Sequence, residues 1–279
     1  MEIHGWRYYN HAAMPSTPPH READLTPIRD GSIWKMDGSP LLARWTTDWD
    51  CGHETNWWYV IKDTPFDIES LKAKRRYEIN KGLRSFEVKR IPDPAVYAKT
   101  LSEIVVSAYE EYPAAYRPEI DKDLFAESVE KYWQGADVFG AFSVQSGNLV
   151  GYALLFSFDT YSDFAMMKVI PSYEKQGVNA ALVYGILDDY RERLAKGFYI
   201  CDGARNVSHE TAFQDYLEKY FGFRKAYCNL NLAYAPKWGW IVKCLFPFRN
   251  ALKKLDGISL FHKINSILKM EEFARNTYE

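Results

Sequence analysis

The most restrictive feature of the sequence is the run from residue 161 to residue 203, where an apolar stretch, a polar loop with one glycine, a periodic helix and the strand FYICDG follow one another. The helix places its apolar residues on one face, namely Val183, Ile186, Leu187, Tyr190 and Leu194. A strand, a helix and a strand in this order predict a crossover between two parallel strands.

Two further strands are expected just before this crossover. The segments 137–145 and 149–158 flank Ser146-Gly147-Asn148 and predict a hairpin, which the segment 161–171 continues as a third antiparallel strand. An antiparallel half that leads into a parallel pair makes a mixed sheet. The sequence therefore predicts an α+β fold.

The N-terminal part carries a simpler pattern. SIWKM and LLARWT flank Asp37-Gly38 and predict a hairpin, and WWYVIK at 57–62 predicts a third strand. Asp67 is expected to cap a helix that ends at Gly82, before the strand SFEVKRI. The first thirty residues show no periodicity and are expected to run over the surface.

Helices are predicted before and after the antiparallel strands in the sequence. Asp93 followed by Pro94 is a typical helix start, and DKDLFAESVEKYW predicts a second helix. Another helix is expected from about Ser208, with Phe213, Tyr216, Leu217 and Tyr220 on one face. FRKAYCNLNLAY then supplies the closing strands.

This order of elements over residues 95–235 resembles the GNAT superfamily of acyl-CoA N-acyltransferases. The block 32–91 resembles a shortened second GNAT-like unit, and the tandem arrangement is similar to the Fem-type peptidyltransferases, which use aminoacyl-tRNA. The resemblance implies a partial GNAT-like unit at 1–92 and a GNAT-like acyltransferase domain at 93–235. An amphipathic helical tail is expected at 236–279.

The loop at 174–180 is the candidate site for a phosphate. A helix N-terminus offers unpaired amides and a positive dipole end, and glycine allows close approach. Of the family pattern only Gly177 matches, because Glu174 and Asn179 occupy the other positions; a plain turn is the alternative. The resemblance implies that acetyl-CoA or another acyl-CoA is held by Val169, Ile170, Lys175, Gln176, Gly177, Val178, Asn179 and Ala180. Gly177→Val is expected to abolish donor binding without unfolding the protein.

Polar residues gather where the predicted parallel strand ends. Asp202, Arg205, Asn206 and His209 are the candidate site residues, because ligands bind at such strand ends. His209 suits a general base but also fits a buried face of its helix. Arg205 suits binding of a carboxylate or phosphate, with a pair to Asp202 as the alternative. We take Arg205 and Asn206 as substrate-binding residues.

A general acid is harder to assign from the sequence. In the GNAT superfamily a tyrosine four residues before the glycine of the last helix serves as acid, and here Glu218 occupies that position. Tyr216 and Tyr220 are the nearby tyrosines. We expect His209, Tyr216 and Asp202 to be the catalytic residues, and the sequence shows no metal-binding pattern.

Two basic stretches bear on partners. The segment 71–90 has eight Lys or Arg against two Glu, which suits a tRNA contact or a solvated helix face. The segment 236–254 combines basic residues with aromatic rings, which suits peripheral membrane contact or packing on the core. The N-terminus lacks a signal-peptide pattern, and the four cysteines form no CxxC pair. We expect a cytoplasmic location, and peripheral contact with the inner face of the membrane is the alternative.

These features predict an acyltransferase that moves an acyl group from an acyl-CoA to an amine, such as an envelope sugar or peptide precursor. A Fem-type transferase dependent on aminoacyl-tRNA is the first alternative. A non-catalytic binding protein that keeps the fold is the second.

Overall fold

The computed structural model describes residues 3–112, 117–207, 212–255 and 259–275. It divides into two compact units, each built from separate stretches of chain. The first unit comprises Met1–Val60, Ala204–Ala212 and Lys225–Glu279, and the second comprises Ile61–Gly203 and Phe213–Arg224. These units do not follow the expected boundaries near residues 92 and 235, because residues 61–92 belong with the second unit and residues 225–235 with the first.

A five-stranded mixed sheet forms the centre of the second unit. Its strands lie in the order β9-β8-β7-β6-β5. All neighbours are antiparallel except β8 and β9, which run parallel as predicted from the crossover. The strands are β5 (Phe86–Arg90), β6 (Asp137–Ser143), β7 (Leu149–Ser157), β8 (Tyr161–Val169) and β9 (Tyr199–Ala204).

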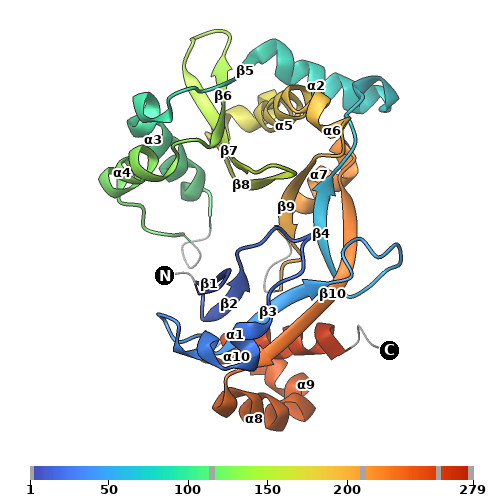
Figure 1. Ribbon diagram of the computed structural model, residues 1–279. Helices are drawn as coiled ribbons and strands as arrows, with labels where there is room; N and C mark the ends of the chain where they lie inside the picture. Colours follow the sequence, from blue (N-terminus) through green and yellow to red (C-terminus); the bar gives the residue numbers. More distant parts are fainter. Residues whose placement is uncertain (1–2, 113–116, 208–211, 256–258, 276–279) are drawn as a thin grey trace. The chain divides into compact units, whose positions relative to one another are not determined.

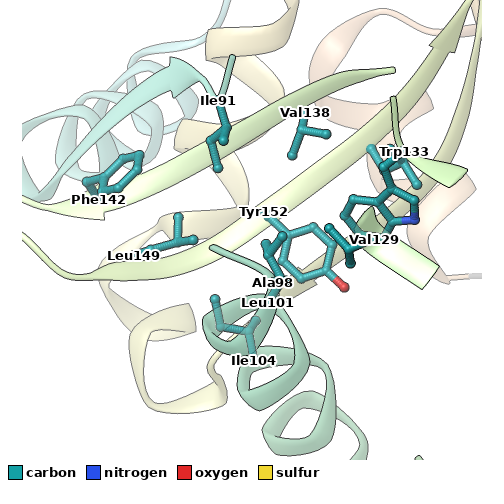
Figure 2. Close-up of a cluster of buried hydrophobic side chains, with 11 residues drawn as sticks. Ile91, Ala98, Leu101, Ile104, Val129, Trp133, Val138, Phe142, Leu149 and Tyr152 are labelled. Atoms are coloured by element: carbon teal, nitrogen blue, oxygen red, sulfur yellow. The ribbon is translucent and has the colours of Figure 1, made fainter. Parts of the chain in front are cut away.

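Helices cover both faces of this sheet (Figure 1). On one face, α3 (Ala98–Glu110) and α4 (Lys122–Tyr132) close a buried cluster that includes Leu101, Val129 and Trp133 (Figure 2). Tyr152 and Leu154 reach this cluster from β7, since alternate strand residues share a face. On the other face, α5 (Val178–Asp189) lies against the sheet and α2 (Ala73–Ser85) packs against α5.

The first unit contains strands that the sequence analysis missed. The strands β1 (Trp6–Tyr9) and β2 (Ala12–Pro15) pair as a hairpin within the first thirty residues, which were expected to be irregular. Next come β3 (Leu42–Thr47) and β10 (Arg224–Tyr234), in the order β1-β2-β3-β10. Trp6 and Ala13 are fully buried and explain why this hairpin stays on the unit.

The prediction of a hairpin at Asp37-Gly38 is wrong. Residues Ser32–Lys35 form the 3₁₀-helix η1 instead of a strand. Ile33 and Met36 are both buried, and a spacing of three residues places them on one face of a helical turn. The strand expected at 57–62 is confirmed as β4 (Trp57–Lys62).

The helix around residues 68–85 also differs from the prediction. Asp67 does act as a cap, but its side chain accepts a hydrogen bond from the Glu69 N–H and caps the short helix η2 (Ile68–Ser70). The longer helix α2 begins at Ala73 and runs past Gly82 to Ser85. Gly82 is therefore an interior helix residue, and its role is packing.

The C-terminal part of the first unit is helical, as expected. It comprises α8 (Pro236–Leu245), η6 (Phe246–Phe248), α9 (Arg249–Leu252), η7 (Lys253–Leu255) and α10 (Ser259–Arg275). Among the described helices, none has the length and apolar content needed to cross a bilayer.

Candidate functional site

The parallel pair β8 and β9 separates soon after it forms. Pairing covers only Tyr161, Ser162 and Asp163 of β8 against Tyr199, Ile200 and Cys201 of β9. The register of β8 against β7 shifts at the same level, because Leu154 faces Met166 while Leu155 faces Phe164. Ala165 is the extra residue of this bulge and is exposed. Beyond Asp163 the backbone of β8 therefore lacks β9 as a partner, and its peptide groups are available to a ligand.

Asp202 lies at the point where the two strands separate. It follows Cys201, the last paired residue of β9, and Asp163 is the residue opposite Cys201. Burial raises the pKa of Asp202 to about 7, and the negative charge of Asp163 adds to this effect. A carboxyl with this pKa is half ionised near neutrality and can accept or donate a proton.

The helix α7 (Ala212–Phe221) brings Tyr216 into the second unit. The ring of Tyr216 packs against Phe213, Tyr220 and Phe221, and Phe213 in turn meets Phe164 of β8 edge-to-face at 5.7 Å. Burial raises the pKa of Tyr216, with Glu78 of α2 as a further cause. Its hydroxyl stays protonated at neutral pH, which is the form that a general acid needs.

The loop before α5 is built around a contact between two glycines. Gly177 has a φ of 91° and is the N-cap of α5. A Cβ at Gly82 would lie 2.4 Å from the Gly177 oxygen, and a Cβ at Gly177 would lie 3.1 Å from the Gly82 Cα. Lys81 also donates to the Lys175 carbonyl at 2.7 Å. The helix α2 is thus held directly against the loop, and Gly177 is required for this packing.

This contact corrects the expected effect of Gly177→Val. The valine would need a left-handed backbone and would collide with the backbone of α2, so it would disturb the fold. The loop still has the features of an anion site, since no side chain caps α5 and Lys175 and Gln176 are exposed.

The other members of the predicted cradle differ in exposure. Val178 and Ala180 are buried and contribute backbone amides only, while Asn179 is half-buried. Val169 is buried at the end of β8, and Ile170 packs beside the cluster of Figure 2.

Arg205 and Asn206, predicted as substrate-binding residues, belong to the first unit. The guanidinium of Arg205 donates to the Asn56 carbonyl at 2.7 Å and stacks over the rings of Trp58 and Phe273. Both residues line a cavity of the first unit. His209 lies outside the described residues. Among the residues that the structure describes, no cluster could hold a metal ion.

Several residues that shape these sites were not predicted from the sequence. Gly82 inside a helical pattern was a signal of close packing, because an interior glycine costs helix stability. Arg44 lies on the same face of β3 as the buried Leu42, and a charged residue on a buried face of a strand was a second signal. Asp163 had no sequence signal, since its closeness to Asp202 depends on the register of the parallel pair.

Comparison with solved structures identifies the fold of this chain. No family model and no curated protein matches the chain. The crystal structure of FemX is similar with a TM-score of 0.51 at 11% identity, over 76% of this chain and 77% of that chain. The chain has the tandem GNAT-type fold seen in FemX.

Two further structures have a comparable extent of match. A conserved protein of unknown function from Bacteroides thetaiotaomicron VPI-5482 gives a TM-score of 0.50 at 13% identity, over 80% of this chain and 78% of that chain. L-PGS from Bacillus licheniformis gives 0.47 at 13% identity, over 82% of this chain and 79% of that chain. At these identities the likeness to FemX and to the Bacteroides protein concerns the fold alone.

Proposed function

We propose that the protein transfers an acyl group from an activated donor to an amine. The observation that carries the proposal is the early separation of β8 from β9 directly beside Asp202. Unpaired strand backbone can hold the donor, and a carboxyl with a pKa of about 7 can take a proton from the amine. The GNAT-type fold agrees with this chemistry.

The proposed reaction uses two side chains of the second unit. The amine nitrogen attacks the carbonyl carbon of the donor, the C–N bond forms and the bond from that carbon to the leaving group breaks. The ionised Asp202 accepts the ammonium proton, and the Tyr216 hydroxyl donates a proton to the departing thiolate. The role of His209 as a further general base stays a prediction from the sequence.

An acyl-CoA is the donor that we propose. The Gly177 oxygen faces α2, so the trans peptide directs the Val178 N–H to the opposite side. The amides of Val178, Asn179 and Ala180 begin α5 without acceptors in the preceding turn, and the exposed Lys175 adds a cation. These groups suit the pyrophosphate of CoA.

A Fem-type donor, aminoacyl-tRNA, is the second candidate, and FemX-like architecture favours it. The basic stretch at 71–90 is less free to bind RNA than its composition suggests. Ion pairs already occupy four of its cations: Arg75 with Glu78, Arg76 with Glu69, Lys89 with Glu87, and Arg90 with Asp137 and Asp189. A paired cation releases fewer counterions on phosphate binding, which weakens the case for tRNA.

Turnover tests the reaction itself. Purified protein is incubated with acetyl-CoA or with aminoacyl-tRNA and a panel of amines, and release of the thiol or the tRNA is followed. We expect thiol release that rises with pH through about 7, the pKa of Asp202, and falls about 100-fold or more in Asp202→Asn. Full activity in Asp202→Asn would contradict the assignment of the base.

We further propose peripheral membrane contact through the C-terminal helices of the first unit. The segment from α8 to η7 carries five basic residues and no acidic one. Its exposed apolar side chains are Trp240 at 72%, Phe248 at 63%, Leu255 at 43%, Ile241 at 37% and Trp238 at 36%. Exposed tryptophan beside lysine is favoured at the interface of an anionic bilayer. Such exposure argues against the alternative that these rings pack on the core.

Vesicle flotation measures this contact. Wild type is expected to float with vesicles that contain phosphatidylglycerol and to be released by high salt. A Trp240→Ala/Phe248→Ala variant should lose most of the binding, whereas the matched variant Tyr77→Ala/Tyr132→Ala, which removes two exposed rings of the second unit, should not. Equal flotation of both variants, or none by wild type, would refute the proposal.

A further inference from the structure

The first unit contains a cavity of about 680 Å³ between strands and the helix α10. Its cationic and imidazole groups are Arg44, Arg205, Lys263, His11 and His262. Among the described residues, no carboxylate lines it. The remaining wall is partly apolar, with Met14, Leu42, Val207, Ile267 and Met270. The cavity thus joins a positive end to an apolar surface.

Arg44 is the most unusual residue of this cavity. It projects from β3 and is largely shielded from solvent. Among the described residues, its guanidinium donates only to two sulfur atoms: Met14 Sδ at 3.3 Å and Met270 Sδ at 3.9 Å. The Trp57 ring is a distant neighbour, 6.0 Å from Cζ to the ring centroid. No carboxylate within the described part of the chain pairs with it. Burial lowers the pKa of Arg44, because desolvation disfavours the charged form.

A guanidinium without a carboxylate partner is costly to bury. Thioether sulfur is a weak acceptor and does not replace the lost hydration. The contacts of Arg44 with Met14 and Met270 do not explain why an arginine stands here. An apolar side chain would pack better between these two methionines and would stabilise the fold more. Its five N–H donors are suited to a planar or tetrahedral oxyanion that enters the cavity.

Arg205 supplies the second guanidinium. One nitrogen donates to the Asn56 carbonyl and the plane stacks on Trp58 and Phe273, so its orientation is fixed while its remaining donors stay available. Lys263 of α10 is exposed at the same cavity. Three permanent cations in one cavity suit a group that carries more than one negative charge.

We propose that this cavity binds an organic phosphate that carries an apolar chain. The phosphate is held by Arg44 and Arg205, and the chain lies along the methionine and aliphatic wall. The proposal does not rest on acyl transfer, because it concerns residues of the first unit alone. A membrane lipid headgroup or a free phosphate ester would both present this chemistry.

Calorimetric titration of the full-length protein with hexyl phosphate, glycerol phosphate and inorganic phosphate tests the cavity. We expect hexyl phosphate to bind about tenfold or more tightly than glycerol phosphate, because it adds buried methylene groups. Comparable binding of glycerol phosphate would overturn the part of the proposal that assigns the apolar wall to the ligand.

Arg44→Met is the decisive variant, with Arg7→Met as the matched control, since Arg7 is an exposed arginine of β1. Arg44→Met should weaken hexyl phosphate binding at least about tenfold, the usual effect of losing a charged hydrogen bond. It should also raise the unfolding temperature, because an unpaired buried charge is removed. Arg7→Met should change neither.

Two results would overturn the proposal. One is unchanged hexyl phosphate affinity in Arg44→Met, and the other is no binding by wild type at millimolar ligand. A fall in the unfolding temperature of Arg44→Met would show that Arg44 stabilises the fold, and would remove the argument from its unpaired state.

Discussion

Asp202 and Arg44 are ionisable side chains whose surroundings disfavour charge, and within the described part of the chain neither forms an ion pair. For Asp202, burial and the nearby Asp163 raise the pKa to about 7. For Arg44, two sulfur atoms replace water. Such residues lower the stability of the fold, and a function is a reason for a protein to keep them.

The raised pKa of Asp202 predicts a pH-dependent stability. A carboxyl whose folded-state pKa exceeds its unfolded value stabilises the protein below the unfolded value, near ~4, and this contribution is lost as pH rises through about 7. Asp202→Asn removes the titration. Relative to wild type, the variant should therefore be more stable at pH 8 than at pH 5, by about 3 °C or more in Tm. Thermal unfolding at both pH values checks this, and an equal difference at the two values would contradict the raised pKa.

The sequence predicted Asp202 and Tyr216 as catalytic residues, because both belong to a polar segment at a strand end, and their catalytic role stays a prediction. It also placed Arg205 and Asn206 in one site with Asp202, and the structure assigns them to the first unit. The chain passes from the second unit to the first within β9, at Gly203 and Ala204. No residue pattern marks that crossing.

At the scale of elements, the contact of α2 with α5 depends on Gly82 and Gly177. The α2 backbone approaches the Gly177 carbonyl closely enough that even a methyl group at Gly82 would collide with it. The same contact fixes the loop that we propose for the donor phosphates. The position of α2 is thereby coupled to the geometry of the loop.

Gly82→Ala tests this coupling. Alanine in a helix interior normally stabilises by up to about 1 kcal/mol, but here the Cβ would meet the Gly177 oxygen at 2.4 Å. We expect a net loss of about 1–3 kcal/mol in the free energy of unfolding. Gly239→Ala in α8 is the matched control, since its Cβ would meet only Tyr234 Cβ at 3.4 Å, and it should not destabilise. Denaturant unfolding measures both, and equal effects would exclude a special role for the Gly82 contact.

The sequence predicted most elements of the second unit because their patterns are local. The hairpin at Gly147, the parallel pair β8 and β9, and the helices α3 to α5 follow from periodicity and turn residues. The strands β1 and β2 escaped prediction because they are only four residues each. Their pairing to β3 involves contacts that a local pattern does not show.

At the scale of the whole molecule, the chain crosses between the two units at residues 60, 203, 212 and 224. Contiguous domains at 1–92, 93–235 and 236–279 were the natural expectation, because sequence patterns reveal elements in order. Unit membership instead depends on which elements pack together. Thus α2 and β5 belong with the five-stranded mixed sheet of the second unit, and β10 belongs with the N-terminal strands.

The proposed acyl transfer requires that the second unit binds an activated acyl donor, with the donor phosphates at the loop before α5. Calorimetric titration of acetyl-CoA into the full-length protein tests this most directly, with Lys175→Glu as the disabling variant and the exposed Lys196→Glu as the matched charge control. We predict one-to-one binding by wild type and Lys196→Glu, weakened about tenfold or more in Lys175→Glu. No binding of acetyl-CoA by wild type at millimolar ligand, or binding that Lys175→Glu leaves unchanged, would contradict the claim.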